Sequence, residues 1–429
     1  MTTKLENIST PFTKDNIGKM GFFAMAVTLF LMSFPRSWSL YSLGVFLTAG
    51  LFLWLLDFKN TRRELYSFWP VVAAPLLYFL INMLSALIQN GGYNLLGHRM
   101  MFFLIPVFGF SVFINSYFRS RLPGLLRIFV LGIICISVFL LLRSLVVTIG
   151  RLSNGLSLHD LIKGEGSKFI SLGFSVIEHP TYFSMKINFA ILLLVFYSED
   201  WGIRWYIMLP VYLLLSITLF LAASKAGIAA WIAVSIVLII RAGKKNSFRP
   251  VAYILMILIL ISMTVMAAKR LERVSYFFRV IRLSLTTEDH FMDLDQRARE
   301  WYTAVNMIKE KPLSGYGLAK IEEKMVEKYR EYGFEEEAQK KLNAHNQFLE
   351  AQVTFGIAGT ISLLLMLAVP LIYRKRSAYK HFMGPFISLV IFYLLFESMF
   401  DRQWGIMFFL LFYCLFLLSA SVRKSEIVI

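Results

Sequence analysis

Apolar runs of about twenty residues, separated by short polar or basic stretches, repeat along most of this chain. The hydrocarbon core of a bilayer is about 30 Å thick and is crossed by about twenty residues of α-helix. The pattern therefore predicts an all-α polytopic membrane protein with about twelve transmembrane helices. We place them at residues 17–34, 38–57, 67–88, 96–116, 123–148, 180–198, 204–221, 223–241, 249–268, 347–373, 380–399 and 403–421.

The region 204–241 is one apolar run of about forty residues, far too long for a single crossing of the bilayer. The sequence Ala222-Ala223-Ser224-Lys225-Ala226-Gly227 interrupts it. Small residues flanking a lysine suit a tight turn, so we predict two helices joined at this point.

Lys and Arg in short loops remain on the cytoplasmic side of a membrane. With the N-terminus inside, every loop on that side is basic, and we expect both termini to be cytoplasmic. The residues concerned are Lys59, Arg62, Arg63, Arg119, Arg121, Arg204, Arg241, Lys244, Lys245, Arg249, Arg374, Lys375, Arg376, Lys380, Arg423 and Lys424. The two longer segments, 149–179 and 269–346, then lie on the outer side.

The segment 269–346 is the only long polar stretch, and it divides the chain into helices before it (1–268), an outer helical cap (269–346) and helices after it (347–429). A helix is expected over 299–308, ended by Pro312 and Gly315. Apolar residues at three- and four-residue spacing predict an amphipathic helix from Ala319 to Leu342.

Composition agrees with a membrane protein, because 57% of residues are hydrophobic and the mean hydropathy is +0.63. The net charge of +17 would fit nucleic acid, but the basic residues occur in short loops, which argues against that partner. Cys135 and Cys414 lie inside apolar runs, so neither a disulfide nor a cysteine metal site is implied. The first apolar run lacks a small-residue cleavage site and is interpreted as a helix rather than a cleavable signal peptide.

Polar residues at the outer ends of membrane helices are candidates for function because they are costly there. Basic candidates are Arg99, Lys225, Arg297, Arg299 and Arg402, with Arg36 and Arg151 of less interest. Each alone could be an interfacial anchor. Several converging on one site would bind a phosphate or diphosphate.

Histidines near the same surface are His98, His179, His290 and His345. His345 stands at the start of a predicted helix, where an imidazole could accept a proton from a hydroxyl nucleophile. The alternative is a helix-start residue next to a capping Asn343 or Asn346. The sequence leaves both interpretations open.

Several catalytic motifs are absent from the sequence, including a phosphate-binding loop, a His-Glu-x-x-His helix and a Gly-x-Ser-x-Gly elbow. Asp293-Leu294-Asp295 has the spacing of a divalent-ion site, but one such pair in a charged loop is a weak signal. We therefore expect no metal and no cofactor.

The order of three polar motifs resembles the O-antigen ligase and polymerase superfamily. They are Arg297 to Trp301, then Pro312-Leu313-Ser314-Gly315-Tyr316-Gly317, then His345-Asn346 followed by Gly356-Ile357-Ala358-Gly359. The long outer loop, His179-Pro180-Thr181-Tyr182 opening a helix, and Ser224-Lys225 at a turn also fit.

The resemblance implies a GT-C-like fold in the bacterial inner membrane with the active site facing the periplasm. It implies transfer of a glycan from undecaprenyl diphosphate to an acceptor hydroxyl, which is a lipid A–core sugar in the ligases. The family's essential Arg and His correspond to Arg297 and His345. The family usually has Ser-Arg where this chain has Ser224-Lys225, so charge is kept but bidentate phosphate binding is lost.

These expectations combine into one mechanism, a metal-independent inverting transfer. His345 would act as the base, and Arg297, Arg99 and Lys225 would bind the diphosphate. Secondary candidates are Arg299, Trp301, Arg402, His179, Tyr182 and Asn346. The partners are the lipid-linked glycan donor, lipid A–core or another glycan acceptor, and membrane lipids.

Two alternatives remain open. One is a polysaccharide polymerase or a protein O-oligosaccharyltransferase, which differs only in its acceptor. The other is a transporter or flippase of polysaccharide or carrier lipid, for which Glu178, Lys186 and Glu397 are the residues available.

Overall fold

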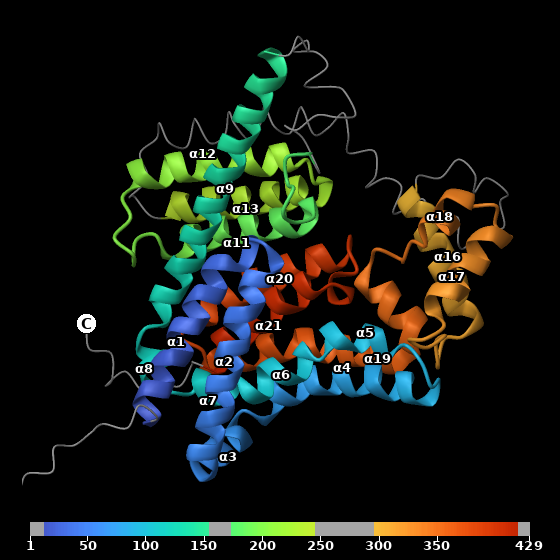
Figure 1. Cartoon of the computed structure of the whole chain (residues 1–429), viewed down its shortest axis with the longest axis horizontal. Coiled ribbons are helices and arrows are strands. Elements are labelled where there is room, and N and C mark those ends of the chain that lie inside the picture. Colours follow the sequence, from blue (N-terminus) through green and yellow to red (C-terminus); the bar gives the residue numbers. More distant parts are fainter. Residues whose placement is uncertain (1–12, 154–172, 245–295, 419–429) are drawn as a thin grey trace, which may run out of the picture.

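The computed structural model describes residues 13–153, 173–244 and 296–418, and no strand occurs among them. Figure 1 shows the arrangement of the helices. The N-terminal helices are α1 (Lys14–Phe30), α2 (Arg36–Leu56), α3 (Phe58–Ser67), α4 (Trp69–Ile88), α5 (Tyr93–Arg99), α6 (Met101–Phe108), α7 (Phe110–Phe113), α8 (Ser116–Ser120) and α9 (Leu122–Ser153). The others are α11 (Pro180–Tyr197), α12 (Trp205–Ala222), α13 (Lys225–Lys244), α16 (Gln296–Glu310), α17 (Ile321–Glu331), α18 (Glu335–Lys340), α19 (Gln347–Tyr373), α20 (Lys380–Leu394), the 3₁₀ turn η5 (Met399–Asp401) and α21 (Gln403–Leu418).

The membrane class is confirmed by the length and composition of these helices. Within the described residues, six helices are long and apolar enough to cross a bilayer, and four shorter apolar helices accompany them. The expected helix at 249–268 lies outside the described residues, so the total of twelve remains a prediction.

The expected single helix at 96–116 is wrong, because the chain is broken there into α5, α6 and α7. Pro106 lacks the N–H needed for a continuous ladder. The indole of Trp54 donates to the carbonyl of Val107 at 2.8 Å, which satisfies an acceptor near the break. A Cβ on Gly109 would stand 2.8 Å from the ring of Phe46, so α6 and α7 meet at a point of close packing with α2.

The predicted turn between 204–221 and 223–241 is confirmed. Helix α12 ends at Ala222, Ala223 has a left-handed backbone with φ 52°, and α13 begins at Lys225. The expected helix at 299–308 is present as α16. The single helix expected over 319–342 is wrong: it is divided into α17 and α18 at Gly333, where φ is 73°.

Contacts between distant segments distinguish the two ends of the bundle. Lys14 pairs with Asp57 at 3.0 Å, and Arg376 donates to the carbonyl of Ser67 at 3.3 Å, all from segments expected on the cytoplasmic side. At the other end, Gln89 donates to the carbonyl of Tyr316 at 2.6 Å. Helices α3 and α8 accordingly lie far from α16–α18 in Figure 1.

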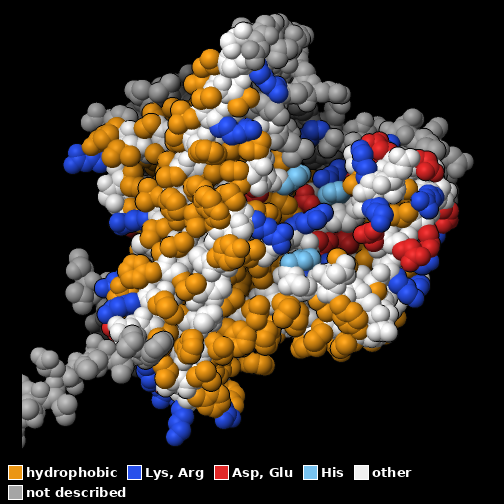
Figure 2. All heavy atoms as spheres, in the orientation of Figure 1, with side chains coloured by type: hydrophobic (Ala, Val, Ile, Leu, Met, Phe, Trp, Pro, Cys, Tyr) orange, Lys and Arg blue, Asp and Glu red, His pale blue; other side chains and the backbone are white. Residues whose placement is uncertain are grey.

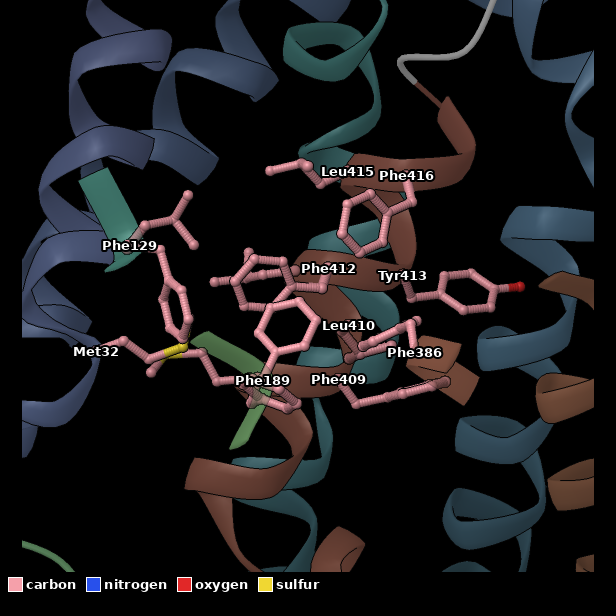
Figure 3. Packing of buried hydrophobic residues seen from close by; sticks show 14 of the residues in the cluster. Met32, Phe129, Phe189, Phe386, Phe409, Leu410, Phe412, Tyr413, Leu415 and Phe416 are labelled. Carbon is pink, nitrogen blue, oxygen red and sulfur yellow. The ribbon is translucent and has the colours of Figure 1, made fainter. Parts of the chain in front are cut away.

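Helix α21 is the centre of the packed core, because every residue from Gly405 to Leu418 is buried. A helix that is apolar on all sides belongs in the middle of a bundle. Figure 3 shows its aromatic side chains around Phe189 of α11, whose ring lies 4.5 Å from that of Phe412, centroid to centroid. Edge-on aromatic pairs of this kind add to the stability that burial provides.

Helices α16–α18 form a separate group with its own small core, which includes Met307, Met325, Tyr329 and Phe334. Residues 311–320 connect α16 to α17, and we call them the docking loop. Its backbone bonds directly to α19, with Tyr316 N donating to Val353 O at 2.9 Å and Gly317 N to Thr354 O at 2.7 Å.

A break in α19 makes this docking possible. Gly356 has φ 62° and ψ −152°, which is not helical, and the amide of Ile357 donates instead to the carbonyl of Leu313 at 3.2 Å. A Cβ on Gly356 would stand 2.1 Å from that carbonyl oxygen, so only glycine fits. The docking loop is therefore a structural joint between α16–α18 and the membrane helices.

Helix α4 completes the joint from its C-terminal end. The side-chain amide of Gln89 receives a bond from Ala319 N at 2.8 Å, and the hydroxyl of Ser85 receives one from Leu318 N at 2.9 Å. The position of α16 relative to α4 and α19 is thus fixed mainly by hydrogen bonds to backbone groups.

Candidate active site

Charged side chains gather in a hollow between the apolar bundle and α16–α18. Figure 2 shows Lys and Arg, Asp and Glu, and His side chains together there, whereas hydrophobic side chains dominate the bundle surface on this face. Several charges of both signs at one place in a membrane protein point to function.

Arg297 and His345 both contact one carboxylate, that of Glu300. Arg297 Nη1 lies 3.2 Å from Glu300 Oε2, and His345 Nδ1 lies 2.9 Å from the same oxygen. Arg297 and Glu300 are three residues apart on α16, so they share one face of the helix. The structure therefore brings together the two residues that the sequence placed at opposite ends of the polar segment.

Glu300 is fully buried, and this burial raises its pKa to about 8, although the charge of Arg297 and the hydrogen bond from Gln296 partly oppose the rise. When this carboxyl group is ionised, it accepts a hydrogen bond from Nδ1–H of His345. That tautomer leaves the lone pair on Nε2, which is the form a general base requires.

Residues 341–346, which we call the histidine loop, present this imidazole. His345 has a positive φ of 42°, a strained conformation for a residue with a side chain. Its amide donates to Asn343 Oδ1 at 3.1 Å, and the amide of Ala344 donates to Glu350 Oε2 at 3.0 Å. Asn346 caps α19 by accepting from the amides of Phe348 and Leu349. Asn346 is thus the helix cap, and His345 is free of that task.

A second group of polar residues lies beside Arg297. The pKa of His179, the N-cap of α11, is lowered first by burial and then by the positive charges of Arg297 and Arg402. Glu397 is within electrostatic range of both guanidinium groups. Arg402 is exposed and has no ion pair among the residues that the structure describes. These four side chains therefore share one electrostatic neighbourhood.

Tyr182 belongs to the same region. Its ring packs edge-on against His179, with 6.1 Å between the centroids. The hydroxyl is buried without a hydrogen-bond partner in the described part of the chain, and it feels the charges of Glu397, Asp401 and Arg402. A buried hydroxyl of this kind is available to a polar ligand.

Arg99 is buried and already engaged. Its Nη1 donates to Asn82 Oδ1 at 2.8 Å, and its Nη2 pairs with Asp401 Oδ1 at 2.6 Å. The charge of Arg99, which we predicted to bind a diphosphate, is therefore neutralised by the carboxylate of Asp401.

Lys225 is the exposed first residue of α13. Two residues further on, Gly227 packs so closely on Ser184 of α11 that a Cβ there would stand 2.4 Å from the serine Cβ. Lys225 thus lies at the end of the bundle where His179 precedes α11. Its contact with a diphosphate remains a prediction.

Two secondary candidates contact protein groups. Arg299 pairs with Glu337 at 2.6 Å and so joins α16 to α18. Trp301 packs against Phe396 with 6.4 Å between ring centroids. Both contacts hold α16 in place.

The residues that a transporter would use include a fixed ion pair. Lys186 Nζ lies 2.7 Å from Glu178 Oε1 and 2.7 Å from the carbonyl of Met32, and both side chains are buried. The ammonium group also lies 4.4 Å from the centroid of the Trp404 ring. These contacts join α11 to the bundle.

Sequence reasoning missed Glu300 and Asp401, and it considered Asn343 only as a helix cap. The spacing of Glu300 after Arg297 on one predicted helix was a usable signal, because residues three apart face the same way. No such signal exists for Asp401, which meets Arg99 across 302 positions of sequence.

No group of three or more His, Cys, Asp or Glu side chains that could hold a metal occurs in the described ranges. Asp293 and Asp295, the weak candidates for a divalent ion, lie outside those ranges.

A comparison with family models gives a match for the chain, and it covers the polar segment. Residues 210–364 match the model described as O-antigen ligase. This part of the chain is therefore similar to the O-antigen ligase family. The match includes Lys225, Arg297, Glu300 and His345 and confirms the resemblance seen in the sequence.

This family comprises O-antigen ligase and polymerase-type glycosyltransferases that use lipid-linked glycans. A comparison with curated proteins gives no match for the chain. Arg99, His179, Tyr182 and Arg402 fall outside the matched residues.

Proposed function

We propose that this O-antigen ligase family protein transfers a glycan en bloc from undecaprenyl diphosphate to an acceptor hydroxyl, and that the acceptor is a sugar of lipid A–core. The observation that carries the proposal is the contact of Arg297 and His345 with the shared carboxylate of Glu300. One group can stabilise a leaving diphosphate, and the other can activate a hydroxyl.

The reaction begins with removal of a proton. His345 Nε2 takes the proton of the acceptor hydroxyl, and the resulting imidazolium is stabilised by ionised Glu300. The acceptor oxygen bonds to the anomeric carbon while the bond from that carbon to the diphosphate oxygen breaks. The electron pair leaves with the diphosphate, and a single in-line displacement inverts the anomeric centre.

Arg297 meets the charge that develops on the leaving group, and Arg402 and Lys225 add positive charge at the same end of the bundle. Arg297 is suited to this role because its guanidinium side chain is about one-third exposed and can fork onto two phosphate oxygens. The step as written needs no metal ion. In cells, the proposal places the site on the periplasmic face of the bacterial inner membrane, with both termini cytoplasmic.

Reconstitution in liposomes tests the proposal. The purified protein is given undecaprenyl-diphosphate glycan with lipid A–core, with a second lipid-linked glycan, or with a Ser/Thr peptide. Glycan appearing on lipid A–core supports ligation. Chain extension on the lipid carrier would identify a polymerase, glycosylated peptide would identify a protein transferase, and translocation of carrier lipid without transfer would overturn the enzyme proposal.

A further inference from the structure

A chain of buried and half-buried side chains runs from α4 to the backbone of His345. Asn82 of α4 accepts from Arg99 of α5 at 2.8 Å, and Arg99 pairs with Asp401 of η5 at 2.6 Å. Asp401 Oδ2 accepts from Asn343 at 3.4 Å, and Asn343 Oδ1 accepts from the amide of His345 at 3.1 Å. We propose that Arg99, acting through Asp401 and Asn343, is a positioning residue that holds His345 in its reactive conformation.

The backbone of His345 needs such support. Its φ of 42° is a conformation that a side chain disfavours, and it persists only where surrounding contacts impose it. The histidine loop includes a second residue of this kind, Lys341, with φ 50°. Glu350 assists by accepting from the amide of Ala344 at 3.0 Å. Asp401 of η5 and Glu350 of α19 therefore hold the loop directly.

The same contacts argue against Arg99 as a ligand of the donor. Arg99 is 6% exposed, and both of its terminal nitrogens are hydrogen-bonded to protein groups. A diphosphate that took the guanidinium would leave the carboxylate of Asp401 without its cation in a largely buried place, which is strongly unfavourable. Arg402, by contrast, is exposed, and no ion pair with it is seen in the residues described.

Asn343→Ala is the decisive variant, because it breaks the chain and leaves the Arg99–Asp401 pair intact. This inference rests on the proposed transfer reaction. We expect kcat to fall about 10- to 100-fold with KM for the lipid-linked donor unchanged, since a displaced base slows chemistry without weakening binding. Hydrogen exchange at amides 343–346 should become faster. Asn60→Ala, on α3 at the far end of the bundle, is the matched control and should change neither quantity.

Arg99→Lys is the second variant, because lysine can reach Asn82 or Asp401 but lacks the fork that holds both. A lower kcat at constant KM supports the positioning role. A higher KM for the donor at constant kcat, or unchanged exchange and kcat in Asn343→Ala, overturns it. If wild-type protein transfers glycan to no acceptor, the proposed function fails, while the exchange measurement still decides whether Asn343 holds the loop.

Discussion

Two loops join α16–α18 to helix α19, and they are held there in different ways. The docking loop has its left-handed residues at Gly315 and Gly317, and it bonds to α19 through backbone groups. The histidine loop has its left-handed residues at Lys341 and His345, and it is held by the side chains of Asn343 and Glu350.

The difference separates a structural joint from a catalytic element. Glycine adopts positive φ without strain, so the left-handed residues of the docking loop add no strain that other contacts must offset. A histidine in that conformation costs free energy that other contacts must offset, and such strain is typical of functional sites. Damage to the docking loop should therefore lower stability, whereas damage at the histidine loop should lower activity.

The largest expected effect is that of His345→Ala. Loss of the general base should lower kcat about 10²- to 10⁴-fold, while the thermal unfolding temperature stays near that of wild type. Transfer to lipid A–core in liposomes measures the first and a melting curve in detergent the second. His381→Ala, at the exposed start of α20, is the matched control. Near-normal turnover of His345→Ala would remove this residue from the reaction.

Arg297→Lys should come next. Lysine retains the positive charge but lacks the paired N–H donors with which arginine binds two phosphate oxygens. We therefore expect kcat to fall about 10²-fold, near the lower limit for loss of a group that stabilises the charge on a leaving group. Single-turnover rates with the lipid-linked donor provide the measurement. Arg330→Lys on the exposed face of α17 should have no effect. An unchanged rate for Arg297→Lys would argue against a bidentate contact.

Gly356→Ala tests whether the contact between the docking loop and α19 stabilises the protein. The added methyl group meets Leu313 O in a backbone with φ 62°, so the folded state should lose about 1–3 kcal/mol of stability and melt at a lower temperature. Gly384→Ala in α20, where a Cβ meets nothing within 4 Å, is the control and should melt at or slightly above the wild-type temperature. Equal melting temperatures for the two variants would show that the joint does not stabilise the protein.

The smallest expected effect is that of Glu300→Gln, which should change how the transfer rate depends on pH. With a Glu300 pKa of about 8, the wild-type rate should rise as pH increases through 8, because the ionised carboxylate favours the tautomer with a free Nε2. The glutamine variant should lack this rise, and its rate near pH 7 should change by less than about tenfold. A pH–rate profile of both proteins decides the point, and the same alkaline rise in both would exclude Glu300 as its source.

The raised pKa of Glu300 also makes the stability of the folded protein depend on pH. Because folding favours the protonated form of Glu300, the contribution of this group is fully present below its unfolded pKa of 4.5 and is lost as pH rises through about 8. Melting temperatures of wild type should therefore decline over that interval more than those of Glu300→Gln.

Periodicity was sufficient for most of the fold, because apolar runs such as 69–88 and 347–373 have the length that a bilayer imposes. Periodicity did not reveal the places where a helix is broken inside an apolar or amphipathic run. Pro106 and Gly109 lie in a uniformly apolar run, and only the packing against α2 reveals the break. Similarly, the helical spacing over 319–342 concealed the turn at Gly333.

Part of the candidate site was also predictable from the sequence. Arg297 and His345 followed from the order of motifs, and Asn346 was recognisable as a cap. The surroundings of Arg99 were not, because its partner Asp401 is brought to it by the packing of α21 and not by any local pattern. Sequence shows which side chains could react, and the structure shows which of them are already neutralised.

The break at Gly356 also links distant parts of the chain to one another. Backbone bonds from the docking loop and side chains at the end of α4 tie α16–α18 to α19 and α4. Because α19 also packs along α4 and against α16, the break couples the position of α16, which carries Arg297 and Glu300, to the packing of two membrane helices.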